Sequence, residues 1–96
     1  MSEVIFEAQV ESEDEFWQRF KEHCKKQRWE IYDVSDMETT WYALPSAACS
    51  GYGIGVQEII VRDKSKREIT LTRISEYYYG YINVKVIQCG PAPAAE

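Results

Sequence analysis

Hydrophobic and polar residues alternate over Val4–Val10, and the spacing of the apolar positions then changes. Alternation with a period of two is typical of a strand with one buried face. Over Ser12–Trp29 the apolar residues recur at intervals of four, at Phe16, Phe20 and Cys24. This spacing predicts an amphipathic helix that turns one stripe toward a core. The chain therefore begins with a strand that leads directly into a helix.

Both ends of the predicted helix carry residues that stabilise helix termini. Ser12 and Glu15 have the spacing of a capping box, in which each side chain pairs with a free backbone N–H near the first turn. Acidic residues fill positions 13–15, and residues 25–28 include three bases. Each group of charges therefore lies at the favourable end of the helix dipole.

Two further strands are predicted after the helix. Trp29–Val34 and Met37–Leu44 are both rich in β-branched and aromatic residues, and Ser35-Asp36 between them has turn chemistry. We therefore expect a β-hairpin. Pro45–Gly55 is rich in small residues and glycine, which predicts a long irregular segment because proline cannot continue a central strand.

The second half of the chain predicts a three-stranded meander. Its expected strands are Val56–Arg62, Arg67–Ile74 and Tyr77–Cys89, with Ser75-Glu76 as the second turn. If the first turn, around Ser65, has odd length, the apolar residues of all three strands share one face, which we expect to be the core face. These residues are Ile59, Val61, Ile69, Leu71, Ile82, Val84 and Val86.

Together these elements predict an α+β fold, in which one N-terminal helix packs on a mostly antiparallel sheet of five or six strands. With 96 residues the chain has the length of one domain. We expect residues 1–89 to form that domain and residues 90–96, GPAPAAE, to be a flexible tail. An unpaired strand at an edge of the sheet would offer a route to a homodimer.

The chain is acidic, with a net charge of −5. This charge argues against direct binding of nucleic acid, because proteins that bind nucleic acid carry a basic surface. Residues 1–48 hold 11 acids and 5 bases, a net −6, whereas residues 49–96 hold 5 acids and 6 bases, a net +1. The acidity therefore belongs to the first half of the chain.

Two stretches of the first half contain acidic residues without bases. Carboxylates spread over a rigid surface can occupy a basic groove on another protein, with an affinity that falls as salt rises. The leading prediction is therefore a non-catalytic binding protein that occludes a basic, nucleic-acid-handling protein, as an inhibitor, an immunity protein or a phage-borne antagonist does. Its candidate binding residues are Glu11, Glu13, Asp14, Glu30, Asp33, Asp36 and Glu38. Ordinary solubility and helix capping explain the same charges without a partner.

A second prediction, from a different functional class, uses a tyrosine-rich face of the sheet. If Tyr77–Cys89 is one strand, then Tyr77, Tyr79 and Tyr81 share its outward side, beside Arg62 and Lys85. Tyrosines in such a row offer a platform on which a ligand or the bases of a single-stranded nucleic acid can stack. Tyrosine is also a good strand residue, so the pattern has a purely structural explanation as well.

Residues with catalytic or metal-binding potential are sparse. The three cysteines, Cys24, Cys49 and Cys89, lack the spacing of a metal site, and Asp33–Glu38 lacks the pattern of a calcium-binding loop. Cys49 activated by His23 is one conceivable catalytic pair, but chance placement of a helical histidine and a small loop residue explains it better. We therefore expect neither an enzyme nor a bound metal or cofactor.

The cysteines and the first residues favour a cytoplasmic protein. An odd number of cysteines suits a reducing compartment better than a disulfide framework. The N-terminal residues carry no basic cluster, and no apolar run approaches the length of a membrane span. We therefore expect no association with a membrane.

Overall fold

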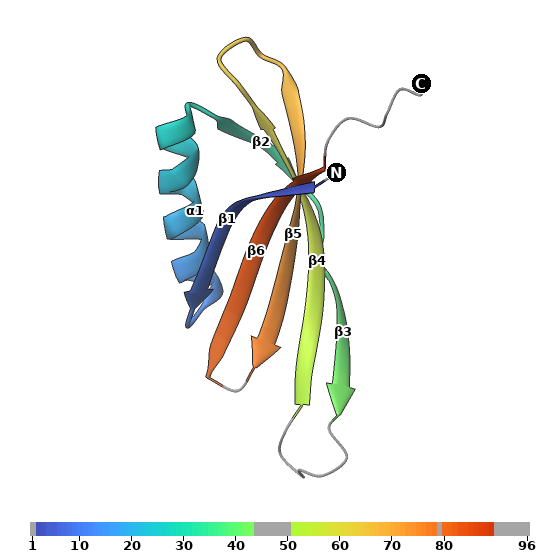
Figure 1. Cartoon of the computed structure of the whole chain (residues 1–96). Coiled ribbons are helices and arrows are strands. Elements are labelled where there is room, and N and C mark those ends of the chain that lie inside the picture. The colour runs from blue at the N-terminus through green and yellow to red at the C-terminus, as the bar shows by residue number, and fades with distance from the viewer. Residues whose placement is uncertain (1, 44–50, 79, 90–96) are drawn as a thin grey trace, which may run out of the picture.

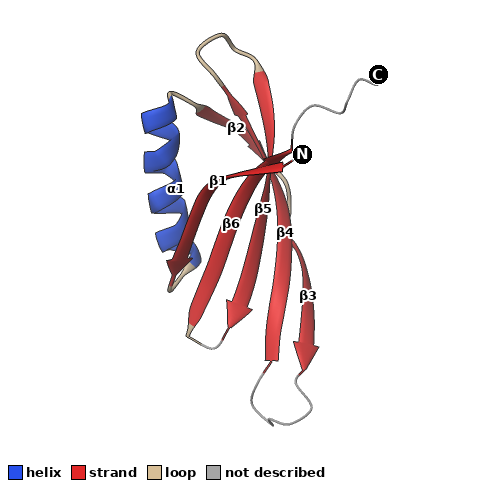
Figure 2. Cartoon of the chain, viewed as in Figure 1, coloured by secondary structure: helices blue, strands red, loops and turns tan. Residues whose placement is uncertain are grey.

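The computed structural model describes residues 2–43, 51–78 and 80–89. Figure 1 shows one helix beside a twisted sheet, and Figure 2 colours the same view by secondary structure. The elements follow the order β1 (Ser2–Val10), α1 (Glu13–Gln27), β2 (Glu30–Val34), β3 (Glu38–Ala43), β4 (Gly51–Arg62), β5 (Glu68–Tyr78) and β6 (Tyr81–Cys89). The α+β prediction is confirmed. The expected tail at 90–96 lies outside the described residues.

The strands form one six-stranded antiparallel sheet in the order β1-β6-β5-β4-β2, with β3 also paired to β4. The long strand β4 therefore has β5 along one edge and both β2 and β3 along the other. β2 pairs with the half of β4 near Arg62, and β3 pairs with the half near Gly51. The edge strand of the sheet is thus built in two pieces, with a break at residues 35–37.

This break replaces the β-hairpin expected at Ser35-Asp36, and the hairpin prediction was wrong. Ser35 does not reverse the chain, because its backbone and side chain both bond to β4. Its N–H donates to the carbonyl of Glu58 (2.9 Å), and its Oγ accepts from the N–H of Glu58 (3.0 Å). The chain therefore continues along the same edge after an irregular step.

The turn expected at Ser75-Glu76 was also placed wrongly. Both residues lie within β5, and the chain reverses between Tyr78 and Tyr81, which pair with each other. Gly80 in this turn has φ of 93°, a conformation that glycine adopts without the steric cost paid by other residues. The true turn therefore lies where the sequence offers a glycine.

The segment expected to be irregular, Pro45–Gly55, overlaps the start of β4, which begins at Gly51. Residues 44–50 lie outside the described residues. Gly55 is a buried strand residue, and a Cβ on it would overlap Met37 Sδ. The close approach of Met37 to the backbone therefore explains why this strand position is a glycine.

The core lies between α1 and one face of the sheet. Phe16, Phe20 and Cys24 are buried on the helix, as predicted, and Phe6 of β1 meets both phenylalanines edge-on at 5.9 and 5.5 Å. Each fully buried phenylalanine contributes about 1.5–3 kcal/mol. Six of the seven predicted core positions of the meander are buried and the seventh packs against them; they are Ile59, Val61, Leu71, Ile82, Val84 and Val86, with Ile69 partly buried.

The helix begins where its sequence predicts and ends at Gln27, two residues before the expected Trp29. Ser12 is the N-cap, and its Oγ accepts from the N–H of Glu15 (3.1 Å). The Glu15 carboxylate accepts from the N–H of Glu11 (2.9 Å), one residue earlier than the standard capping box. At the other end, Arg28 adopts a left-handed conformation (φ 61°) that closes the helix.

Candidate functional site

The helix covers one face of the sheet, and no described element lies against the other, which we call the open face. Side chains alternate between the two faces along each strand. The residues opposite α1 are therefore the even-numbered positions of β4 and β5 and the odd-numbered positions of β6, as the pairing registers require. Where their side chains are described, these positions are partly or fully exposed, whereas Ile59, Leu71 and Val84 of the covered face are buried.

Carboxylates dominate the open face. In the described strands, seven acidic side chains point to it, and only Arg62 and Lys85 carry positive charge there. Arg62 already pairs with Glu68 (3.3 Å), and its guanidinium lies 3.6 Å from the ring centre of Tyr32. The seven acids, placed by the register of their strands, are Glu7, Glu30, Asp33, Glu38, Glu58, Glu68 and Glu76.

Two shallow hollows lie on or beside this face. One, of about 400 Å³, lies over β1, β6 and β5, where Ile74 forms part of the lining and Glu7 and Glu76 flank Lys85. The other, of about 460 Å³, lies at the break between β2 and β3, with Val56 among its carboxylates. The acidic residues of the second hollow are Asp36, Glu38 and Glu58.

The predicted acidic residues fall into two groups. Glu30, Asp33 and Glu38 belong to the open face, and Asp36 lies beside them in the break; all four are exposed. Glu11, Glu13 and Asp14 instead surround the start of α1, on the covered side of the sheet. The acidic first half of the sequence is therefore not one surface.

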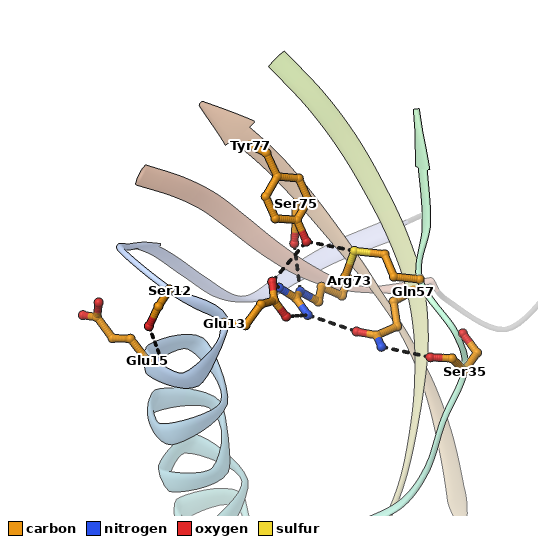
Figure 3. A network of polar contacts seen from close by, with 9 residues as sticks. Ser12, Glu13, Glu15, Ser35, Gln57, Arg73, Ser75 and Tyr77 are labelled. Atoms are coloured by element: carbon orange, nitrogen blue, oxygen red, sulfur yellow. Dashed lines mark hydrogen bonds and ion pairs between the residues drawn. The ribbon is translucent and has the colours of Figure 1, made fainter. Parts of the chain in front are cut away.

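Glu13 differs from the others because it binds a buried arginine. Figure 3 shows its carboxylate facing the guanidinium of Arg73, with contacts of 2.6 Å from Nη2 and 3.0 Å from Nη1. Burial raises the pKa of Glu13, but the hydrogen bonds and positive charge of Arg73 outweigh that effect and hold the pKa below its usual value. Its ionised form is thus used to neutralise Arg73.

Arg73 is fully buried, although it carries a charge. Its Nε donates to Ser75 Oγ (2.8 Å), and its Nη1 also donates to Gln57 Oε1 (3.1 Å). The guanidinium lies 4.0 Å from the ring centre of Phe16. A buried charge must have such partners, since leaving it unpaired costs several kcal/mol.

Arg73 was not among the residues predicted from the sequence, although the strand pattern contained a signal. Leu71, Arg73 and Ser75 occupy alternate positions of β5, and the first of these was assigned to the core face. Because Arg73 is two residues after Leu71, the same alternation places it on the core face, and a charged residue there needs a buried partner. The partner itself was not predictable, because Glu13 lies 60 residues away in the sequence.

The expected tyrosine platform is divided by the turn at Gly80. Tyr77 belongs to β5 and lies on the covered face, where its hydroxyl is 3.0 Å from Glu13 Oε2 and 2.9 Å from Met37 Sδ. Burial and the Glu13 charge raise the pKa of Tyr77. Tyr81 belongs to β6 and lies on the open face with Arg62 and Lys85. The expected common face was therefore wrong, and Tyr79 lies outside the described residues.

Tyr81 has a different aromatic neighbour on the open face. It pairs with Tyr78 across the turn, and the two rings stack with centres 5.0 Å apart and planes 18° apart. The aromatic neighbour of Tyr81 on this face therefore belongs to β5. Tyr78 was not predicted to lie on this face, because the turn was expected at Ser75-Glu76.

The thiol and histidine of α1 have structural surroundings. Cys24 is buried, and burial raises the pKa of its thiol to about 11, so little reactive thiolate forms near neutral pH. His23 lies among Phe6, Phe20 and Trp29, and burial together with the Lys26 charge lowers its pKa. Cys49 lies outside the described residues.

Comparisons with protein-family models, curated proteins and solved structures gave no significant match. Within residues 2–43, 51–78 and 80–89, no group of three or more histidine, cysteine or acidic side chains is arranged to hold a metal ion. The described part of the chain also has no helix with the length and apolar character needed to cross a membrane.

Proposed function

We propose that this is a non-catalytic binding protein that uses its open face to cover a basic surface of another protein. The observation that carries the proposal is the composition of this face, where the described strands place seven carboxylates against two bases. An inhibitor, an immunity protein or an antagonist of a nucleic-acid-handling enzyme would act in this way, because occupying a basic groove blocks its use by nucleic acid.

The open face also has the apolar contacts that a protein partner needs. Val56 is 44% exposed and Tyr32 is 53% exposed, and both lie among the carboxylates near the sheet edge. Apolar contacts supply affinity, whereas complementary charge steers the encounter and selects the partner. The charge contribution should weaken in high salt, since the Debye length falls from about 10 Å at 0.1 M to about 3 Å at 1 M.

The test is a pull-down followed by affinity measurement. The tagged protein is incubated with a lysate of its own cells, washed at low and then high salt, and the released protein is identified and purified. Affinity is then measured for wild type and for the double variant Asp33→Lys, Glu38→Lys. We expect the variant to lose about tenfold or more in affinity, because like charges facing each other cost several kcal/mol.

A matched control is the double variant Glu3→Lys, Glu22→Lys, which changes the net charge equally but lies off the open face. Both of these residues are exposed. We expect this control to bind nearly as wild type does, with small losses from long-range charge only. Equal losses in both variants, or none in either, would contradict the use of the open face.

The stacked pair Tyr78 and Tyr81 supports the alternative, a ligand or single-strand binding module. Stacking on such residues contributes about 1–3 kcal/mol per base, so Tyr81→Ala would weaken binding of an oligothymidylate that the wild type binds. The carboxylates of the same face repel phosphates, which is why we favour a protein partner.

A homodimer through a sheet edge is less favoured than a different partner. The two edges are β1 and the β2–β3 pair. A register shift interrupts each, between Val4 and Phe6 in β1 and between Ile31 and Asp33 in β2. Irregularities of this kind hinder the addition of another strand.

A further inference from the structure

The polar network around the buried Arg73 continues to the break between β2 and β3. Arg73 Nη1 donates to Gln57 Oε1 (3.1 Å), and Gln57 Nε2 donates to the carbonyl of Ser35 (2.9 Å). Figure 3 shows these three residues in one line from the start of α1 to the sheet edge. A continuous path therefore joins the helix to the break.

The side-chain amide of Gln57 has a single orientation that allows both of these hydrogen bonds. Its amide oxygen is held by an arginine, which can only donate, so the amide nitrogen must point away, toward Ser35. Because two hydrogen bonds to Glu13 hold the terminal nitrogens of Arg73 in place, the orientation of the Gln57 amide is determined from inside the protein. The Ser35 carbonyl thus receives its donor from a side chain that the core orients.

Ser35 in turn fixes the backbone that carries the break's carboxylates. Its N–H and Oγ bond to the backbone of Glu58, and its Oγ also lies 3.0 Å from the carbonyl oxygen of Asp36. Asp36 and Glu38 follow within three residues and line the acidic hollow there. The placement of these carboxylates therefore depends on how Ser35 is held.

We propose that Gln57, oriented by the buried Arg73, is a positioning residue for the acidic break between β2 and β3. Arg73 contacts neither Asp36 nor Glu38, and it is buried away from the open face. Its effect is to keep the Gln57 amide aimed at Ser35, so that the carboxylates of the break have one fixed arrangement. The consequence for partner binding rests on the proposed function, whereas the consequence for the break itself does not.

The test uses Gln57→Glu, which keeps an acceptor for Arg73 but removes the donor to Ser35. Backbone hydrogen exchange followed by NMR reports the amides of Ser35 and Glu58, and urea unfolding reports global stability. We expect exchange at these two amides to become about fivefold faster, the effect of losing one hydrogen bond locally. Exchange in the middle of α1 should remain as in wild type.

Ser75→Ala is the matched control, because it removes another hydrogen bond of Arg73 that does not lead to Ser35. We expect this variant to leave exchange at Ser35 and Glu58 unchanged. Wild-type exchange at the break in Gln57→Glu would overturn the proposal. So would an equal acceleration in both variants, since that would reflect general loosening of the network.

Affinity for the purified partner separates this inference from the proposed function. Gln57→Glu adds a negative charge, which by charge alone would strengthen binding to a basic surface. Positioning instead predicts weaker binding, by about threefold to tenfold. If the break loosens and affinity does not fall, the positioning role holds and the proposed use of the break in binding is refuted.

Discussion

The two faces of this sheet are made by the same strands, yet they differ in what they tolerate. On β4, Ile59 is fully buried against the helix, whereas the adjacent Glu58 is exposed on the open face. Among the described residues, Arg73 is the one charged side chain buried on the covered face, and it is surrounded by partners. The open face admits apolar residues such as Val56 without covering them. The comparison shows that water hydrates an exposed charge without help from neighbouring residues, whereas a buried charge needs side chains that neutralise it and bond to it.

The helix-covered face should lose most when an aromatic residue is removed. Phe20 is fully buried between Phe6 and Phe16, so Phe20→Ala is expected to lower the free energy of unfolding by about 3–5 kcal/mol. Val56→Ala on the open face should lower it by less than about 1 kcal/mol, because Val56 is already partly hydrated. Urea titration of both variants measures the difference. Similar losses would show that the open face is also a packed core.

Removing the buried charge should have an intermediate effect. Arg73→Met leaves the Glu13 carboxylate without its partner, but that side chain is 45% exposed and can be hydrated. We therefore expect a loss of about 2–4 kcal/mol, somewhat less than for a fully buried pair. Adding Glu13→Gln to Arg73→Met should cost little more, because the two residues act as one unit. Fully additive losses in urea unfolding would refute the coupling.

The smallest effect expected is a dependence of stability on acid pH. The pKa of Glu13 lies lower in the folded protein than its usual value of 4.5. Its stabilising contribution is therefore complete above pH 4.5 and is lost as the pH falls toward the folded pKa. Glu13→Gln should consequently be less stable than wild type near neutral pH and should approach it in acid. Thermal unfolding from pH 7 to pH 3 measures this convergence, and a constant difference would exclude Glu13 as its source.

The candidate site was only partly predictable. Glu30, Asp33 and Glu38 were identified from the sequence as acidic residues near a strand, and they do share the open face. Their companions Glu7, Glu58, Glu68 and Glu76 were not, because strands distant in sequence bring them to the same surface. The common face expected for Tyr77 and Tyr81 was wrong for a related reason: the turn lies at Gly80, which places the two residues in different strands.

By itself the sequence determined the features that depend on near neighbours. The helix, its caps and its buried stripe follow from residues within a few positions of one another, and the core-facing parity of the strands follows from alternation along each. Only the tertiary structure decided that β2 and β3 both pair with β4 and that Arg73 meets Glu13. These pairings depend on the free energies of contacts between segments that are far apart in the sequence. Each possible arrangement buries different charges and strand edges, and the one with the lowest free energy is adopted. The pattern of residues along a single segment does not show which arrangement that is.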